Sequence, residues 1–290
     1  MEGLVIKNYA GFYYVDTGKI IYRCKARGKF KKDNIKILTG DRVVISVLIP
    51  DSEGVIESLL PRKNELIRPP IANVDQVLLV FSFANPSPNS ELIDRLLVMA
   101  GAADLDVVLV FNKSDLAVLE SQQLFEYYRR ILPKTVAISA HAEIGIDHLM
   151  NYLKHKISVL AGPSGVGKST LVNRLVPGAK LVTGEVSPKI GRGRHTTRHV
   201  ELIKLPLGGF LADTPGFSNL NLPEIDKKDL QNYFPEIKEN RIFCHYPDCL
   251  HVKEPECRIR ELIHKGEIPS FRYENYKAFL EEISQRERSY

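Results

Sequence analysis

Residues 162–169, Gly-Pro-Ser-Gly-Val-Gly-Lys-Ser, decide the fold class of this chain. They match the pattern G-x-x-x-x-G-K-[ST], in which glycines let backbone N–H groups approach phosphates closely. The apolar run 157–160 precedes them and predicts a strand, and a helix is expected to begin near Lys168 with its N-terminus facing the phosphates. In this strand–loop–helix context, Lys168 would reach the β- and γ-phosphates and Ser169 would offer its hydroxyl to Mg²⁺.

A second stretch, residues 112–115 (Asn-Lys-Ser-Asp), has the form of a guanine-recognition motif. It follows the apolar run 106–111, and ligands of open α/β sheets bind at such strand ends. The Asp115 carboxylate can accept hydrogen bonds from N1–H and the exocyclic amine of guanine, a donor pair that adenine lacks, so the motif favours GTP over ATP. Ser139 and Ala140 follow another strand-like run and take the position of a further base-contacting loop.

The order of these motifs is unusual. Ordinary GTPases carry the phosphate loop first and the guanine motif last, whereas this chain places the guanine motif about fifty residues before the phosphate loop. This order indicates a circularly permuted GTPase. A P-loop kinase or ATPase is an alternative that the guanine motif disfavours. A non-enzymatic RNA-binding factor with a vestigial pocket is another, which the intact Asp115, Lys168, Ser169 and Asp213 disfavour.

Asp213-Thr-Pro-Gly216 follows the apolar run 209–212. Asp213 could hold Mg²⁺ through water, and the Gly216 N–H could reach a γ-phosphate, although a simple Pro-Gly turn is the alternative. Many GTPases carry a water-orienting glutamine at the next position. Phe217 stands there instead, so catalysis needs another group.

The segment Arg-His-Thr-Thr at 194–197 offers that group. His195 could orient or deprotonate the attacking water, or it could instead contact a phosphate of a partner. Thr197, or alternatively Thr196, would close on Mg²⁺ as a switch threonine.

Three of the four cysteines lie between positions 244 and 257. With His251 they form C-x₄-C-x-H-x₅-C, a set of three thiolates and one imidazole that suits a closed, structural tetrahedral zinc site. His245 is a competing ligand, but its adjacency to Cys244 would strain simultaneous binding. Cys24 stands apart and is expected to be a small buried apolar residue.

Composition sets the broad class. The 290 residues are 44% hydrophobic and 26% charged, as in a protein with a sizeable apolar core. No long apolar run and no secretory signal are visible, so a cytoplasmic protein without membrane spans is expected. The net charge of +5 is mild, but the basic runs 25–32 and 189–198 contain no acid and favour a polyanionic partner.

The chain also divides by pattern. Short runs rich in β-branched and aromatic residues fill residues 1 to about 66 and predict a small barrel, with residues 61–70 as a linker. Alternating strand and helix patterns then predict a doubly wound α/β domain to about residue 221. The remainder mixes helical segments with the cysteine cluster.

Taken in order, these motifs resemble the bacterial family of ribosome small subunit-dependent GTPase A over essentially the full chain. The resemblance implies an N-terminal OB-fold that binds RNA, a central circularly permuted GTPase domain and a C-terminal, mostly helical zinc-binding domain, for which we expect residues 1–66, 67–221 and 222–290. It also implies GTP hydrolysis to GDP and phosphate, stimulated by the 30S subunit during that subunit's late maturation. The 30S subunit and its 16S rRNA would be the partners of a cytoplasmic protein that we expect to be a monomer.

The resemblance assigns roles to matching positions. His195 is the catalytic candidate, Mg²⁺ would be held by Ser169, Thr197 and Asp213, and one structural Zn²⁺ by Cys244, Cys249, His251 and Cys257. The GTP-binding candidates are Asn112, Lys113, Ser114, Asp115, Ser139, Ala140, Gly162, Pro163, Ser164, Gly165, Val166, Gly167, Lys168, Ser169, Thr170 and Gly216.

Overall fold

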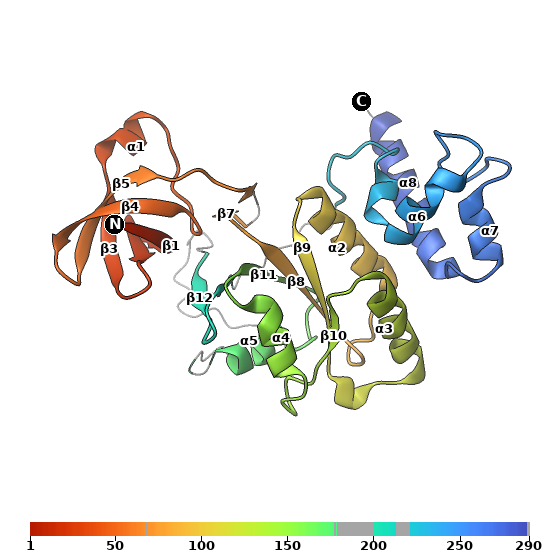
Figure 1. Ribbon diagram of the computed structural model, residues 1–290, viewed down its shortest axis with the longest axis horizontal. Helices are drawn as coiled ribbons and strands as arrows, with labels where there is room; N and C mark the ends of the chain where they lie inside the picture. Colours follow the sequence, from red (N-terminus) through yellow and green to blue (C-terminus); the bar gives the residue numbers. More distant parts are fainter. Residues whose placement is uncertain (68, 177, 179–199, 213–220, 289–290) are drawn as a thin grey trace.

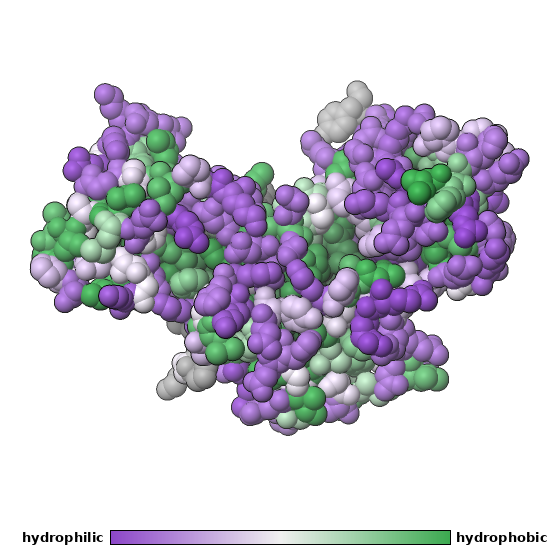
Figure 2. Space-filling view, in the orientation of Figure 1, coloured by the Kyte–Doolittle hydropathy of each residue, from purple (hydrophilic) through white to green (hydrophobic). Residues whose placement is uncertain are grey.

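The computed structural model describes residues 1–67, 69–176, 178, 200–212 and 221–288. Three parts follow one another along the chain: a β-barrel, a sheet covered by helices, and a helical unit (Figure 1). The barrel and the helical unit project from opposite sides of the central part, and the space-filling view shows them as two separate lobes (Figure 2).

The N-terminal part is a closed barrel with strand order β1-β2-β3-β5-β4, which confirms the predicted fold class. Its strands are β1 (Glu2–Tyr9), β2 (Phe12–Asp16), β3 (Ile21–Ala26), β4 (Arg42–Ile49) and β5 (Glu53–Leu59), and the short helix α1 (Gly28–Lys32) follows β3. Inward side chains such as Val5, Val15 and Ile56 are fully buried, and Cys24 is one of them.

The stretch expected to be a linker is held firmly to the barrel. Strands β6 (Glu65–Leu66) and β7 (Ile71–Ala72) pair antiparallel, and the Arg62 Nε atom lies 2.7 Å from Oδ1 of the fully buried Asp41. Gly40 has a φ of +91°, and a Cβ there would lie 2.0 Å from the carbonyl oxygen of Ala72, so only glycine fits this contact. The barrel therefore joins the next part through a packed connection.

The central sheet has the order β10-β9-β8-β11-β13-β12 and is parallel except for its edge strand β12. Its strands are β8 (Gln76–Ser82), β9 (Asp106–Asn112), β10 (Thr135–Ala137), β11 (Ile157–Ala161), β12 (Leu202–Lys204) and β13 (Phe210–Ala212). All seven residues of β8 are buried, as expected for a central parallel strand with both faces covered.

Alternate residues of these strands supply two cores. On one face, Leu79, Leu109 and Val159 pack with α2 (Ser90–Ala102) and α3 (Leu119–Ile131). On the other face, Leu78 and Val108 pack with α4 (Ile146–Leu153) and α5 (Lys168–Leu175). The chain runs from β8 toward β10 and then returns to place β11 on the other side of β8, so the strand order reverses at the β8/β11 boundary. Ligands of such sheets bind at the carboxyl ends of the strands beside this point.

The C-terminal part contains the 3₁₀ segments η2 (Leu230–Tyr233) and η3 (Arg241–Phe243) and the helices α6 (Pro235–Asn240), α7 (Arg258–His264) and α8 (Ser270–Arg288). Its core includes Phe234, Tyr276 and Phe279, together with Val98 from α2. The unit thus packs directly on α2 and α3, the helices that cover one face of the central sheet (Figure 1).

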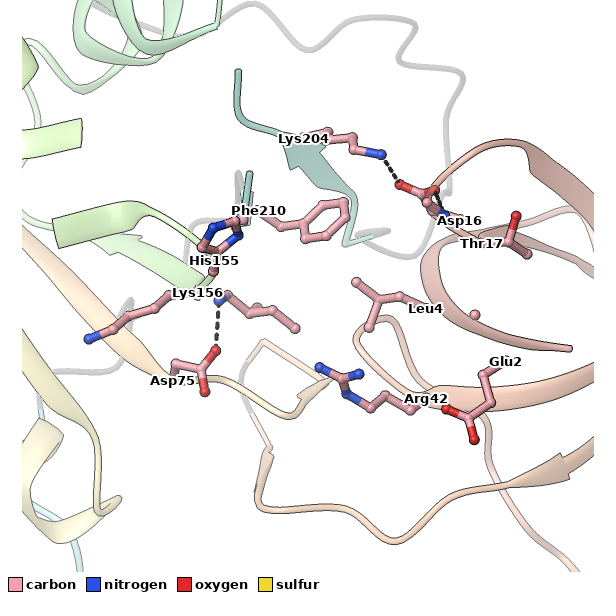
Figure 3. Close-up of a pocket in the computed structure, with 14 residues that line it drawn as sticks. Glu2, Leu4, Asp16, Thr17, Arg42, Asp75, His155, Lys156, Lys204 and Phe210 are labelled. Carbon is pink, nitrogen blue, oxygen red and sulfur yellow. Dashed lines mark hydrogen bonds and ion pairs between the residues drawn. The ribbon is translucent and has the colours of Figure 1, made fainter. Parts of the chain in front are cut away.

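The barrel lies beside edge strand β12 and leaves a cavity of about 460 Å³ at the amino-terminal ends of β11 and β13 (Figure 3). At the cavity, Lys204 Nζ lies 2.8 Å from Asp16 Oδ2. The barrel also contacts the segment before β12, where the Thr39 hydroxyl donates to the Val200 carbonyl at 3.0 Å. This cavity and the phosphate loop lie at opposite ends of β11. Among the described helices, none has the length and apolar character needed to cross a bilayer.

Candidate nucleotide site and metal site

The phosphate loop leaves the end of β11 and enters α5 at Lys168. Gly162 has a φ of +138°, and a Cβ there would lie 2.0 Å from the Val80 carbonyl oxygen, so a side chain at this position is excluded. Gly167 is the N-cap of α5 and has no side chain with which to cap it, so the first N–H groups of the helix are left for an anion. The Lys168 ammonium lies over the loop and donates to the Gly162 carbonyl at 2.9 Å.

Asn112 ties the guanine motif to the two other loops of the site. Its side chain is buried, its Nδ2 donates to the Val166 carbonyl at 2.8 Å, and its Oδ1 accepts from Ala140 N at 2.9 Å. A Cβ on Gly167 would lie 2.4 Å from the same Nδ2, so the phosphate loop packs closely against the motif. Residues far apart in sequence therefore form one hydrogen-bonded site at the carboxyl ends of β9, β10 and β11.

Lys113 and Asp115 complete this end of the site. Lys113 has a left-handed backbone conformation, and its ammonium donates to the Gly165 carbonyl at 2.8 Å and also to the carbonyl of Asn85. Asp115 is exposed, and a hydrogen bond from Ser139 lowers the pKa of its carboxyl below the usual value. Asp115 is therefore an ionised acceptor at neutral pH, which is the state needed to receive the two guanine N–H donors.

The remaining candidates divide into two groups. Pro163, Ser169 and Thr170 are partly buried, whereas Ser164 is exposed on the phosphate loop and Ser114 begins η1 (Ser114–Leu116). The other four predicted residues, His195, Thr197, Asp213 and Gly216, lie outside the described residues. Of the predicted Mg²⁺ ligands, the described part therefore contains Ser169, whose position next to Lys168 at the start of α5 suits a hydroxyl ligand beside the phosphates.

The four predicted metal ligands meet at one point. The ligand atoms of Cys244, Cys249, His251 and Cys257 all lie within 4.8 Å of one another, and His251 Nδ1 is 3.6 Å from Cys244 Sγ and 3.4 Å from Cys257 Sγ. Tetrahedral zinc with its usual bond lengths would place such nitrogen and sulfur atoms about 3.5 Å apart. The donor set and spacing thus fit a metal ion of this kind. His245 points elsewhere, with its Nδ1 3.6 Å from Glu256 Oε2.

The surroundings of this group also suit a bound cation. His251 Nε2 lies 3.1 Å from Gln231 Oε1, which fixes the ring with its other nitrogen toward the cysteines. Burial lowers the pKa of His251 to about 4, so the imidazole is neutral at physiological pH. Burial also raises the pKa of Cys249 to about 12. A divalent cation would therefore have to displace the thiol protons, as metal ions do when they bind cysteine ligands.

Two polar contacts, one at the metal-ligand group and one at the nucleotide site, are absent from the sequence-based prediction. Gln231 lies outside the cysteine spacing and is brought to His251 by η2, and the Asn85 carbonyl comes from the loop after β8. A backbone carbonyl has no signature in sequence, and a lone glutamine does not mark itself as the partner of a histidine. Only the fold reveals these contacts.

Comparison with known proteins agrees with this geometry. Residues 59–223 match the family model described as RsgA GTPase, and residues 2–56 match the RsgA N-terminal domain. A protein of Carboxydothermus hydrogenoformans called "Small ribosomal subunit biogenesis GTPase RsgA" is 78% identical over 289 residues and covers 100% of both chains; one of Moorella thermoacetica with the same name is 49% identical, also over 100% of both.

Solved structures give the same result. The crystal structure of YjeQ from Thermotoga maritima superposes with a TM-score of 0.81 at 39% identity and covers 97% of this chain and 98% of its own. The structure of YloQ, described as a circularly permuted GTPase, superposes with a TM-score of 0.81 at 35% identity and covers 98% and 95%.

Proposed function

The chain belongs to the RsgA family of GTPases and is a GTP hydrolase, and we propose that it binds the 30S ribosomal subunit and acts in the late maturation of that subunit. The relatives' shared name, small ribosomal subunit biogenesis GTPase, supports the target. The observation that carries the chemistry is the Asn112 junction, which joins a guanine motif to a phosphate loop in one site. Such a protein would work in the cytoplasm, as a monomer.

We assign the base to the guanine motif and its neighbouring loop. Asn112 holds the loops together, Lys113 packs over the phosphate loop, and Asp115 accepts from the guanine N–H groups. Ser139 and Ala140 supply the other side of the base pocket. The phosphates lie on the loop 162–167 and on the N–H groups that begin α5, with the Lys168 ammonium moving from the loop carbonyls to the β- and γ-phosphates.

Hydrolysis requires charge stabilisation and an oriented water. Mg²⁺ held by Ser169, with Thr197 and Asp213, would neutralise charge that develops on the phosphates. Because Phe217 cannot orient water, we assign that task to His195. Stimulation by the 30S subunit then follows if subunit binding is what brings His195 to the water.

The barrel offers a face for RNA. In the strand register Tyr9 lies opposite Phe12 and Tyr14 lies opposite Arg23, so these side chains share the outward face of β1, β2 and β3. Arg23 and Lys25 stack over the Phe12 ring, with Arg23 Cζ 5.0 Å and Lys25 Nζ 5.3 Å from its centroid. Aromatic rings interleaved with cations are the surface that unpaired nucleotides bind by stacking and phosphate contact. We propose that 16S rRNA is bound here.

The C-terminal unit would hold one structural Zn²⁺ through Cys244, Cys249, His251 and Cys257. In this division residues 1–66 form the RNA-binding barrel, 67–221 the GTPase domain and 222–290 the zinc-binding domain. The last of these follows directly on the segment 213–216, which we assign to the γ-phosphate. GTP binding would therefore change how the zinc-binding domain is presented to RNA.

GTP hydrolysis by the full-length protein, measured with no ribosomal particle, with 30S subunits and with 50S subunits, tests this proposal. Strong stimulation by 30S alone is the expected result, and Lys168→Ala should abolish turnover in every mixture. Turnover that is indifferent to 30S would contradict the ribosomal part of the proposal. Full activity of Lys168→Ala would show that the phosphate loop is wrongly assigned.

A further inference from the structure

Arg174, near the end of α5, reaches across to the loop that follows β10. Its Nε donates to the Ala140 carbonyl at 3.1 Å, and its guanidinium lies 2.5 Å from Glu143 Oε1. Ala140 and Glu143 both belong to the loop of residues 139–145, here called the base loop because it begins with Ser139 and Ala140. One side chain of α5 therefore contacts the base loop at two points.

The base loop is also held from its other side. Its ends are closed by two backbone hydrogen bonds of 3.0 Å between Ser139 and Ile144. The Ala140 N–H donates to Asn112 Oδ1 at 2.9 Å, while the Ala140 carbonyl accepts from Arg174. The peptide groups of Ala140 are thus fixed between the guanine motif and α5, and the position of the loop depends on both.

The same helix begins with the residues assigned to the phosphates. Lys168 and Ser169 occupy its first turn, and Arg174 its last. The two parts are close in the permuted chain, where the base loop is followed by α4, β11, the phosphate loop and α5. The Arg174 contacts therefore join the two ends of one short segment. Arg174 connects the part of the site assigned to phosphate with the part assigned to the base.

We propose that Arg174 is a positioning residue for guanine recognition: it sets the base loop against α5 and so fixes the geometry in which the base is read. This inference rests on the proposed nucleotide site. Arg174 would then determine guanine selectivity although it lies outside the guanine motif and the phosphate loop. No substrate contact by Arg174 itself is required.

The exposure of the pair separates this role from a general structural one. The Arg174 and Glu143 side chains are 43% and 63% exposed, and ion pairs that are this accessible contribute little to folding. Loss of Arg174 should therefore leave thermal stability nearly unchanged. Its effect should appear in how well the site distinguishes guanine from adenine.

The test is the affinity of the full-length protein for GDP and for ADP, measured by displacement of a fluorescent GDP, in the wild type and in Arg174→Ala, Arg174→Lys and Arg129→Ala. Arg129 is a matched exposed arginine on α3, and its ion pair with Glu126 lies within that helix. Arg174→Ala should bind GDP about 3- to 10-fold more weakly, the size expected for one lost hydrogen bond. ADP affinity and the melting temperature should not change.

Arg174→Lys should recover part of the GDP affinity, because an ammonium can still donate to the Ala140 carbonyl, and Arg129→Ala should match the wild type. Unchanged GDP affinity in Arg174→Ala, or an equal loss for GDP and ADP, would overturn the inference. A wild-type protein that does not prefer GDP to ADP would instead overturn the proposed nucleotide site itself. The two failures are therefore distinguishable.

Discussion

Replacing Arg272 with alanine should release the C-terminal unit from the GTPase domain. The Arg272 side chain on α8 is 1% exposed and forms ion pairs with Asp94 of α2, which is 0% exposed, and with Glu236 of α6, at 2.6 Å. Its Cζ also lies 4.4 Å from the centre of the Phe234 ring. Asn275 and Tyr128 donate further hydrogen bonds to the Asp94 carboxylate.

The magnitude follows from this burial. Removal of one partner of a buried ion pair leaves an uncompensated charge and costs about 3–5 kcal/mol. Whole domains are stable by only about 5–15 kcal/mol, so the loss would affect much of the stability that keeps the unit docked. By contrast Arg258→Ala, which removes the partly exposed pair with Glu261, should cost no more than about 1 kcal/mol.

The assay is hydrogen exchange resolved by segment, because a protein of several domains need not unfold in one step. In Arg272→Ala, exchange should accelerate in α2 and in residues 221–288, while β8 and α5 keep their protection. The triple variant Asp94→Asn/Glu236→Gln/Arg272→Met should recover protection, since neutral groups of similar size replace all three charges. Equal exchange in Arg272→Ala and Arg258→Ala would refute the reasoning.

The pH dependence supplies a second check. Burial raises the pKa of Asp94 above its usual value, and the Arg272 guanidinium opposes that rise. Without Arg272 the pKa of Asp94 should rise further. When the pKa of an acid is higher in the folded than in the unfolded state, its ionisation destabilises the fold. This destabilisation is complete above the folded-state pKa and decreases as the pH falls below that value toward the unfolded-state pKa. The deficit of Arg272→Ala relative to the wild type should therefore shrink as pH is lowered from neutral, and a deficit that grows would contradict this account.

Three further predictions concern the other sites. Asp115→Asn should lose most GTP affinity and gain affinity for xanthosine triphosphate, because its amide NH₂ can donate to the C2 carbonyl that xanthine carries in place of the guanine amine. Equilibrium binding of both nucleotides checks this, and unchanged GTP affinity would remove Asp115 from the site. Phe12→Ala should weaken 30S binding by about 1–3 kcal/mol, the worth of one stacked base, without changing intrinsic GTP hydrolysis; sedimentation with 30S subunits measures it. Cys257→Ser should lower the zinc content and accelerate hydrogen exchange across residues 244–257, and normal metal content by atomic absorption would count against the assigned ligand set.

Local patterns predict the centre of this molecule well. The run 106–111 is recognisable because it is continuously apolar after Asp106, as a strand covered on both faces requires, and the structure extends it by one residue, to Asn112. The phosphate loop carries its own backbone requirements, which Gly162 and Gly167 display in their positive φ values. Such features depend on neighbours in the chain and can be inferred from sequence.

Other elements depend on tertiary contacts and are not visible in the same way. Strand β1 mixes apolar and polar residues and is completed only by pairing with β2 and β4. Helix α4 has eight residues and starts from Gly145, so no capping side chain marks its beginning in the sequence. Arg272 reads as a surface cation on a polar helix, and its burial depends on acids supplied by α2 and α6.

The buried Arg272 network also constrains how nucleotide state can act on the C-terminal unit. The nucleotide site is connected to the C-terminal unit in two ways. One connection is covalent, through the segment after β13, and would respond to the γ-phosphate. The other is a chain of side-chain contacts. The ring centroids of Phe111, which precedes Asn112, and Tyr128 lie 6.4 Å apart, and the Tyr128 hydroxyl donates a hydrogen bond to Asp94. Movement along the covalent connection must break this docking contact, which buries Arg272 with Asp94 and packs Val98 of α2 into the core of the C-terminal unit. Shifting a two-state equilibrium from 99:1 docked to 1:99 takes about 5.5 kcal/mol of differential affinity, which in the free protein GTP would have to supply alone. Contacts made by the 30S subunit with the undocked arrangement would lower this requirement, so the large rearrangement is expected on the ribosomal particle and not in the free protein.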